Sequence, residues 1–245
     1  MSWETIPEEL AAFGEQLRRV PESERTGEVL LRLYTGLEHS WQRNRTLVSA
    51  LPVPVPTPRN VGLHPVGCEL SGAEMRFEFD LGPDIANTRL PVLAQFQVRV
   101  TGDADYNHCL VELEDHWRVD THNFAGTPRE PHPLIHFQRG GHAQDGWAGS
   151  LNYVPGRALP RRDDAGYWQA LLQSPGPRIA FPPLCPMLAI DFVIGQHDGD
   201  VWDRLRSLAE YRRIIKHAQD RLWIPFFDGL ALDGYRRRWL GSMLA

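Results

Sequence analysis

Alternation of polar and apolar side chains through the middle of the chain limits the fold more than any other feature. Residues 75–81 place Phe77 and Phe79 on one face of an extended strand and charged side chains on the other, because successive strand residues point to opposite sides. Further strand patterns cover residues 93–100, 108–113, 117–122 and 134–138. The short separations between them favour antiparallel neighbours, because a parallel crossover needs a longer connection. We therefore predict an antiparallel sheet of about five strands.

Residues typical of turns separate and end the predicted strands. Gly102-Asp103-Ala104-Asp105 predicts the end of the second strand, a turn is expected near Glu114-Asp115, and Gly140-Gly141 ends the last strand. Residues 143–180 are rich in glycine and proline and predict a long loop, with an edge strand at residues 178–181.

Helical patterns flank the predicted sheet. The first fifty residues predict a helix pair with two apolar stripes and a cap for the second helix at Ser23 or Thr26. The stripe residues are Ile6, Leu10, Phe13 and Leu17, then Leu30, Leu33, Leu37 and Trp41. Prolines at every second position of residues 52–58 predict an extended connector. Helices are also expected at residues 187–194, 201–218 and 235–244.

These patterns predict one α+β domain over residues 1–245. It comprises a helical pair (1–50), a sheet core (75–142), a long loop (143–180) and a helical region (186–245). The hydrophobic fraction of 42% and the charged fraction of 23% are those of a globular protein. No apolar run approaches the ~20 residues of a spanning helix, and the acidic start of the chain does not resemble a signal peptide. We expect a cytosolic protein with no membrane partner.

Net charge and cysteine spacing limit the kinds of partner and of cysteine site that the chain can have. The net charge of −5 argues against a global field for nucleic acid, although residues 201–245 carry nine basic and five acidic side chains. That segment could bind a polyanion or an acidic partner; a solvated helix face is the preferred interpretation. Cys68, Cys109 and Cys185 are widely spaced, so they form neither a disulfide framework nor a zinc-finger pattern. Each is interpreted as a small buried residue.

Side chains able to transfer protons or bind a metal are concentrated in residues 108–142, which contain six of the ten histidines. On a strand over residues 116–122, alternate residues share a face, and the residues of the polar side are His116, Arg118, Asp120 and His122. The second strand carries His132 and His136 at helical spacing, but Pro133 between them favours a strand. His136 and Gln138 then share a face.

This cluster admits three interpretations. Asp120, His122, His132 and His136 could bind a divalent zinc, manganese or iron ion. Without a metal, His122 and His136 could act as base and acid, with Arg118 holding an anion and Asp120 orienting a histidine. A purely structural network would pair Arg118 with Asp120 or Glu112.

In the two functional interpretations, the residues expected to bind substrate are His132, Gln138 and Arg139. Common nucleotide, dehydrogenase, α/β-hydrolase and zincin motifs do not occur in the sequence.

Short motifs resemble uncharacterised bacterial families. The resemblance rests on an R-x-D-x-H strand at residues 118–122, an H-P-x-x-H strand at residues 132–136 and an apolar helix led by Pro186. Such families often lie beside mobile-element, toxin and defence genes, which implies a partner protein encoded nearby. The expected function is a bacterial intracellular effector that hydrolyses a phosphodiester or nucleotide-like substrate; the alternative is a non-enzymatic subunit or scaffold of a defence-type complex.

Overall fold

The structure is a computed structural model that describes residues 3–59, 63, 67–82, 91–106, 109–122, 135–139, 168–172 and 183–230. The elements before the sheet are α1 (Ile6–Leu17), the 3₁₀ turn η1 (Pro21–Ser23) and α2 (Glu24–Asn44). The strands are β1 (Thr46–Val48), β2 (Val53–Pro54), β3 (Glu69–Asp80), β4 (Leu93–Tyr106), β5 (Cys109–His122), β6 (Ile135–Arg139) and β7 (Trp168–Leu171). The helices α4 (Pro186–His197), α5 (Gly199–Ser207) and α6 (Ala209–Leu230) follow.

The sheet is built around three long strands, β3, β4 and β5, in the order β1-β3-β4-β5-β6. These five strands pair antiparallel, which confirms the predicted antiparallel sheet. The sequence did not predict β1, and the strands predicted at residues 108–113 and 117–122 are the single strand β5. The short β2 also pairs antiparallel with β3, whereas β7 pairs parallel with β5. The predicted α+β class, with helices from both ends of the chain beside an antiparallel sheet, is confirmed.

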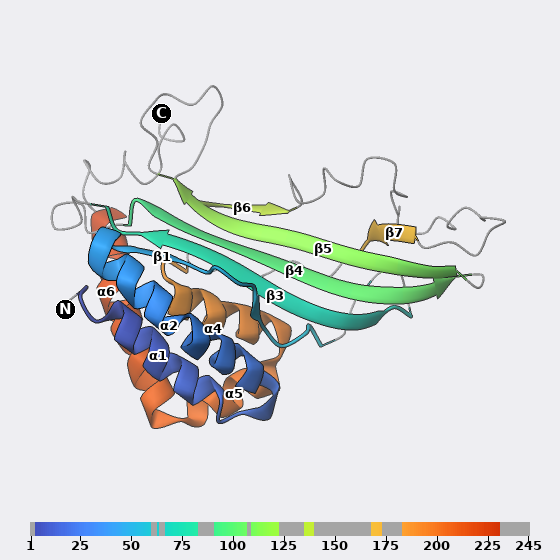
Figure 1. The fold of residues 1–245 in the computed structure, drawn as a ribbon, viewed down its shortest axis with the longest axis horizontal. Coiled ribbons are helices and arrows are strands. Elements are labelled where there is room, and N and C mark those ends of the chain that lie inside the picture. Colours follow the sequence, from blue (N-terminus) through green and yellow to red (C-terminus); the bar gives the residue numbers. More distant parts are fainter. Residues whose placement is uncertain are drawn as a thin grey trace, which may run out of the picture.

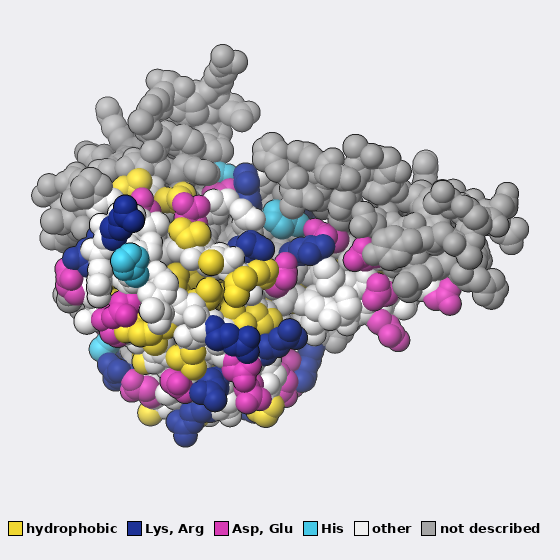
Figure 2. Space-filling view, in the orientation of Figure 1, with side chains coloured by type: hydrophobic (Ala, Val, Ile, Leu, Met, Phe, Trp, Pro, Cys, Tyr) yellow, Lys and Arg dark blue, Asp and Glu magenta, His cyan; other side chains and the backbone are white. Residues whose placement is uncertain are grey.

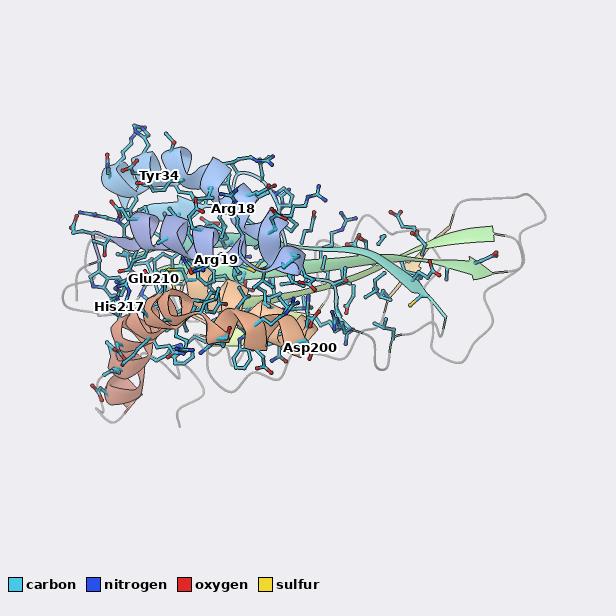
Figure 3. All side chains as sticks on the ribbon, turned by 90° about the horizontal axis from the view of Figure 1, so that it is seen from below. Arg18, Arg19, Tyr34, Asp200, Glu210 and His217 are labelled. Atoms are coloured by element: carbon cyan, nitrogen blue, oxygen red, sulfur yellow. The ribbon has the colours of Figure 1, made fainter. Side chains whose placement is uncertain are left out.

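The helices within the described residues all lie on one side of the sheet (Figure 1). Seen from the helix side, they cover only part of its length, and the strands extend beyond them (Figure 3). One hydrophobic cluster joins both helical regions to the sheet. It contains the predicted apolar stripes of the first two helices, which are buried, together with Phe77, Phe79 and Phe96. The stripe pattern therefore identified the core correctly.

Two predicted turns are wrong. The Gly102–Asp105 sequence continues β4 to Tyr106, since Gly102 is needed for close strand packing and not for a turn: a Cβ there would lie 2.6 Å from the Glu69 carbonyl oxygen. Glu114 and Asp115 lie inside the continuous strand β5. Each carboxylate has an arginine partner, Arg99 for Glu114 on one face and Arg139 for Asp115 on the other.

The single helix predicted over residues 201–218 is also wrong, because α5 ends at Ser207 and α6 begins at Ala209. Arg212 satisfies the end of α5 by donating from Nη1 to the carbonyl oxygens of Arg206 (2.7 Å) and Ser207 (3.1 Å). Ser23 stands at the N-terminus of α2, but its hydroxyl donates to the Leu17 carbonyl instead of capping the helix. Strand β7 interrupts the predicted loop.

The predicted edge strand at residues 178–181, the Gly140-Gly141 turn and the last helix at residues 235–244 lie outside the described residues. Within the described part of the chain, none of the helices combines the length and apolar character that crossing a bilayer requires.

Candidate functional site

The two faces of the sheet differ in chemistry. The face against the helices carries the apolar members of the alternating pattern, such as Phe96, Trp117 and Val119. The opposite face, here called the polar face, comprises Glu74, Arg76, Glu78, Gln95, Gln97, Arg99, Glu114, His116, Arg118, Asp120, His136 and Gln138. The β5–β6 register sets His136 opposite Asp120 and Gln138 opposite Arg118. Backbone pairing thus brings four of the predicted site residues together.

Asp120 is the centre of this group. Arg118 Nε lies 2.7 Å from Asp120 Oδ2, and His136 Nε2 lies 3.6 Å from the same oxygen. Arg118 also donates to Gln138 Oε1 from Nε, at 3.0 Å, and from Nη2. Asp120 is completely buried, and the side chains of His136 and Arg118 are 16% and 23% exposed. The contact between His136 and Asp120 is longer than a hydrogen bond, so the carboxylate acts on the imidazole through its charge.

A second group of charges lies farther along the polar face. Arg99 Nη2 lies 2.6 Å from Glu114 Oε2, and its Nη1 lies 3.8 Å from Glu74 Oε1. The hydrogen bond that Arg99 donates to the Glu114 carboxylate raises the pKa of Arg99. His116 is buried and in register with Arg99. The polar face therefore continues as an ion-pair network beyond the Asp120 group.

The structure separates one predicted residue from the others. Arg139 lies on the helix-facing side, where Nε and Nη2 donate to Asp115 Oδ1 (3.1 Å) and Oδ2 (2.8 Å). This bidentate ion pair with a completely buried carboxylate gives Arg139 a structural partner away from the polar face. His122 ends β5 opposite Leu93, but its side chain and all of His132 lie outside the described residues.

The structure therefore describes only half of the predicted metal-binding site. Of the four predicted ligands, the structure describes the side chains of Asp120 and His136, and its described residues contain no group of three or more metal-binding side chains. A divalent zinc, manganese or iron ion held with His122 and His132 stays a prediction.

The structure describes the side chains of two of the three cysteines that the sequence predicts to be buried: Cys185 is buried, but Cys68 is only half-buried. Cys185 is buried, and burial raises its pKa to about 12, so its thiol is not a nucleophile at neutral pH. All six basic side chains of α5 and α6 contact acidic groups or backbone carbonyls, namely those of Arg204, Arg206, Arg212, Arg213, Lys216 and Arg221. Figure 2 shows basic and acidic side chains interspersed over the helices. This pairing favours the interpretation as an ordinary helix surface.

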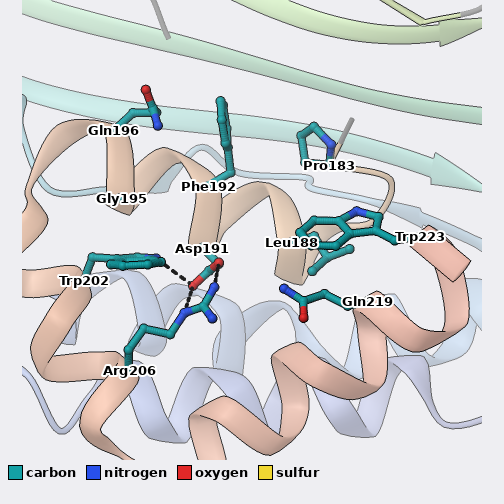
Figure 4. A pocket seen from close by; sticks show the side chains of 10 residues that line it. All are labelled: Pro183, Leu188, Asp191, Phe192, Gly195, Gln196, Trp202, Arg206, Gln219 and Trp223. Carbon is teal, nitrogen blue, oxygen red and sulfur yellow. Dashed lines mark hydrogen bonds and ion pairs between the residues drawn. The ribbon is translucent and has the colours of Figure 1, made fainter. Parts of the chain in front are cut away.

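Sequence reasoning missed a pocket of about 430 Å³ on the helix side of the sheet. It is lined from α4, α5 and α6, with Asp191 paired to Arg206 inside it (Figure 4). The available signal was Asp191 itself, the one charged residue within the apolar residues 187–194. A lone carboxylate in a buried apolar helix requires partners, but the sequence does not say which residues supply them.

Comparison with known proteins found no match among protein-family models, curated proteins or solved structures. A functional assignment therefore depends on the geometry and chemistry of the chain itself.

Proposed function

We propose that the Asp120 group on the polar face is an acid–base site that hydrolyses a phosphodiester or nucleotide-like anion. The observation that supports it is the contact of His136 Nε2 with the completely buried carboxylate of Asp120, 3.6 Å away, beside Arg118. The buried carboxylate of Asp120 places a negative charge beside the imidazole ring. We assign to His136 the transfer of a proton to or from the substrate.

Arg118 provides the anion-binding part of this proposal. Its Nε and Nη2 atoms are used by Asp120 and Gln138, which fix the plane of the guanidinium. The remaining Nη1 group is the donor for a substrate phosphate oxygen, which gains from a charge-assisted hydrogen bond. His122 and His132 complete the proposal as the second proton-transfer group and a substrate contact, or as ligands of a divalent metal with Asp120 and His136.

The wider setting follows from the sequence resemblance. We propose a bacterial intracellular effector of a defence or toxin-type system, acting in the cytoplasm with a protein partner encoded nearby. Nucleotides and nucleic acids are the substrate classes that fit an anion-binding arginine beside a proton-transferring histidine.

Substitution of His136 tests the catalytic role. We expect His136→Ala to lower the rate of cleavage of bis(4-nitrophenyl) phosphate or single-stranded RNA by about 100-fold or more, the usual contribution of one acid–base group. The melting temperature should stay close to that of the unmodified protein, because His136 belongs to the short edge strand β6.

His39→Ala is the matched control, since His39 is exposed on α2. Equal activity of the two variants would remove His136 from the mechanism. Elemental analysis of the purified chain separates metal-dependent from metal-free acid–base catalysis, because only the first requires a stoichiometric transition metal.

One observation favours a second function. Arg118 is engaged by two side chains of the sheet, as in a structural polar network. A non-enzymatic subunit or scaffold of a multiprotein defence-type complex would use the Asp120 group in this way. In that case His136→Ala lowers the melting temperature, and the protein copurifies with a partner without cleaving either substrate.

A further inference from the structure

The pocket between α4, α5 and α6 lies across the sheet from the Asp120 group, so it is a separate site. Its volume of about 430 Å³ falls in the range of small-molecule sites, which runs from about 300 to 1,000 Å³. Phe192, Trp202 and Trp223 contribute aromatic rings from three different helices. Figure 4 shows the two indole rings at opposite ends of the pocket, with Asp191 and Arg206 between them.

Asp191 organises the polar part of this pocket. Its Oδ1 accepts hydrogen bonds from Trp202 Nε1 (3.1 Å), Tyr211 Oη (2.9 Å) and Arg206 Nε (3.1 Å), and its Oδ2 accepts one from Arg206 Nη2. Four donor groups on three side chains therefore surround this one carboxylate. The partners come from α5 and α6, so Asp191 fixes the orientation of one pocket wall.

Arg206 and Gln219 keep hydrogen-bonding capacity for a ligand. The Arg206 guanidinium stacks over the Trp202 ring, 4.6 Å from its centroid, and uses Nε and Nη2 for Asp191, which leaves Nη1 as a donor. Its side chain is 27% exposed and therefore reachable. The Gln219 side chain extends toward the same space (Figure 4) and offers an amide donor and an acceptor together.

The charge balance selects against ionic ligands. Among the lining residues that the structure describes, Asp191 and Arg206 carry opposite charges and neutralise each other, so a carboxylate, a phosphate or an ammonium group gains no net attraction from them. Flat aromatic surfaces beside an amide and one N–H donor match the faces and edges of a planar heterocycle with ring nitrogens and a carbonyl group. We infer that this pocket binds an uncharged nucleobase-type heterocycle, which stacks on an indole ring and hydrogen-bonds to Gln219 and Arg206.

Calorimetric titration of the full chain tests this inference with adenine, hypoxanthine, cytosine and uracil as probes, and with benzoate and benzamidine as charged planar controls. At least one base should bind more tightly than both charged controls. Gln219→Leu, which keeps the side-chain size but removes the amide, should weaken that binding about tenfold or more. Gln42→Leu on the exposed surface of α2 is the matched control and should bind like the unmodified protein.

The inference is overturned if no base binds, if benzoate or benzamidine binds as tightly, or if Gln219→Leu and Gln42→Leu have equal affinities. The thermal stability of Gln219→Leu is measured alongside. If it unfolds, Trp223→Leu takes its place, with the same expected loss of affinity from the removal of a stacking surface. These results are independent of His136, so they do not test the hydrolytic proposal.

Discussion

The buried imidazole of His197 gives the protein a specific dependence of stability on pH. His197 ends α4, is 7% exposed, and its Nδ1 lies 2.7 Å from the Pro56 carbonyl oxygen in the proline connector. A carbonyl oxygen only accepts, so Nδ1 carries the proton of the neutral ring. Burial lowers the pKa of His197 from 6.5 to about 4, although Pro56 and the charge of Asp115 act in the opposite direction.

The sign and size of the effect follow from this pKa. Between pH 6.5 and about 4 the unfolded chain binds a proton at this imidazole and the folded chain does not, so the free energy of unfolding falls as the pH falls. Each tenfold difference in proton affinity corresponds to about 1.4 kcal/mol. The whole difference lowers the free energy of unfolding by about 3 kcal/mol at the acid end of this window.

His197→Asn isolates this contribution, because asparagine places an amide donor near the position of Nδ1 but does not titrate. Urea unfolding, followed by tryptophan fluorescence from about pH 7 to about pH 4, gives the free energy of unfolding of each protein. The variant is expected to be less stable at neutral pH, owing to its smaller side chain, and to lose about 3 kcal/mol less than the unmodified protein on acidification.

The exposed His39 supplies the control, since His39→Asn removes an imidazole without disturbing a buried contact. Carboxylates contribute equally to all three proteins, so only the differences between the curves matter. Parallel curves for the unmodified protein and His197→Asn would refute the claim that this imidazole is held neutral by burial.

Two further substitutions test the packing. Gly27→Ala should lower the free energy of unfolding in urea by about 1–3 kcal/mol, because its Cβ would lie 2.3 Å from the Gly14 carbonyl oxygen. The control Gly36→Ala meets nothing within 4 Å and should be neutral or stabilising. Equal effects would show that α1 and α2 do not cross so closely. Asp191→Asn should cost about 3 kcal/mol in the same measurement, since it leaves Arg206 without its buried counter-charge; unchanged stability would mean that this ion pair does not hold α4 and α5 together.

Local periodicity determined much of the architecture. The apolar stripes of α1 and α2 and the alternation in β3 and β5 each depend on residues within one or two turns or pleats of one another. The same alternation assigned Arg118 and Asp120 to one face, and the short separations between the strands favoured the antiparallel pairing that sets His136 opposite Asp120. This part of the candidate site was therefore predictable from the sequence.

Only the tertiary structure determined which residues pair with the buried carboxylates and where a pocket forms. Glu114 and Asp115 are typical of a turn in the sequence, yet both lie inside strand β5. Arg99 of β4 and Arg139 of β6 pair with their carboxylates there. Asp191 acquires its partners from two other helices, and the pocket exists only where those helices meet. The physical reason is range: a backbone repeat is set by adjacent residues, but the partner of a buried charge is set by packing between segments far apart in the chain.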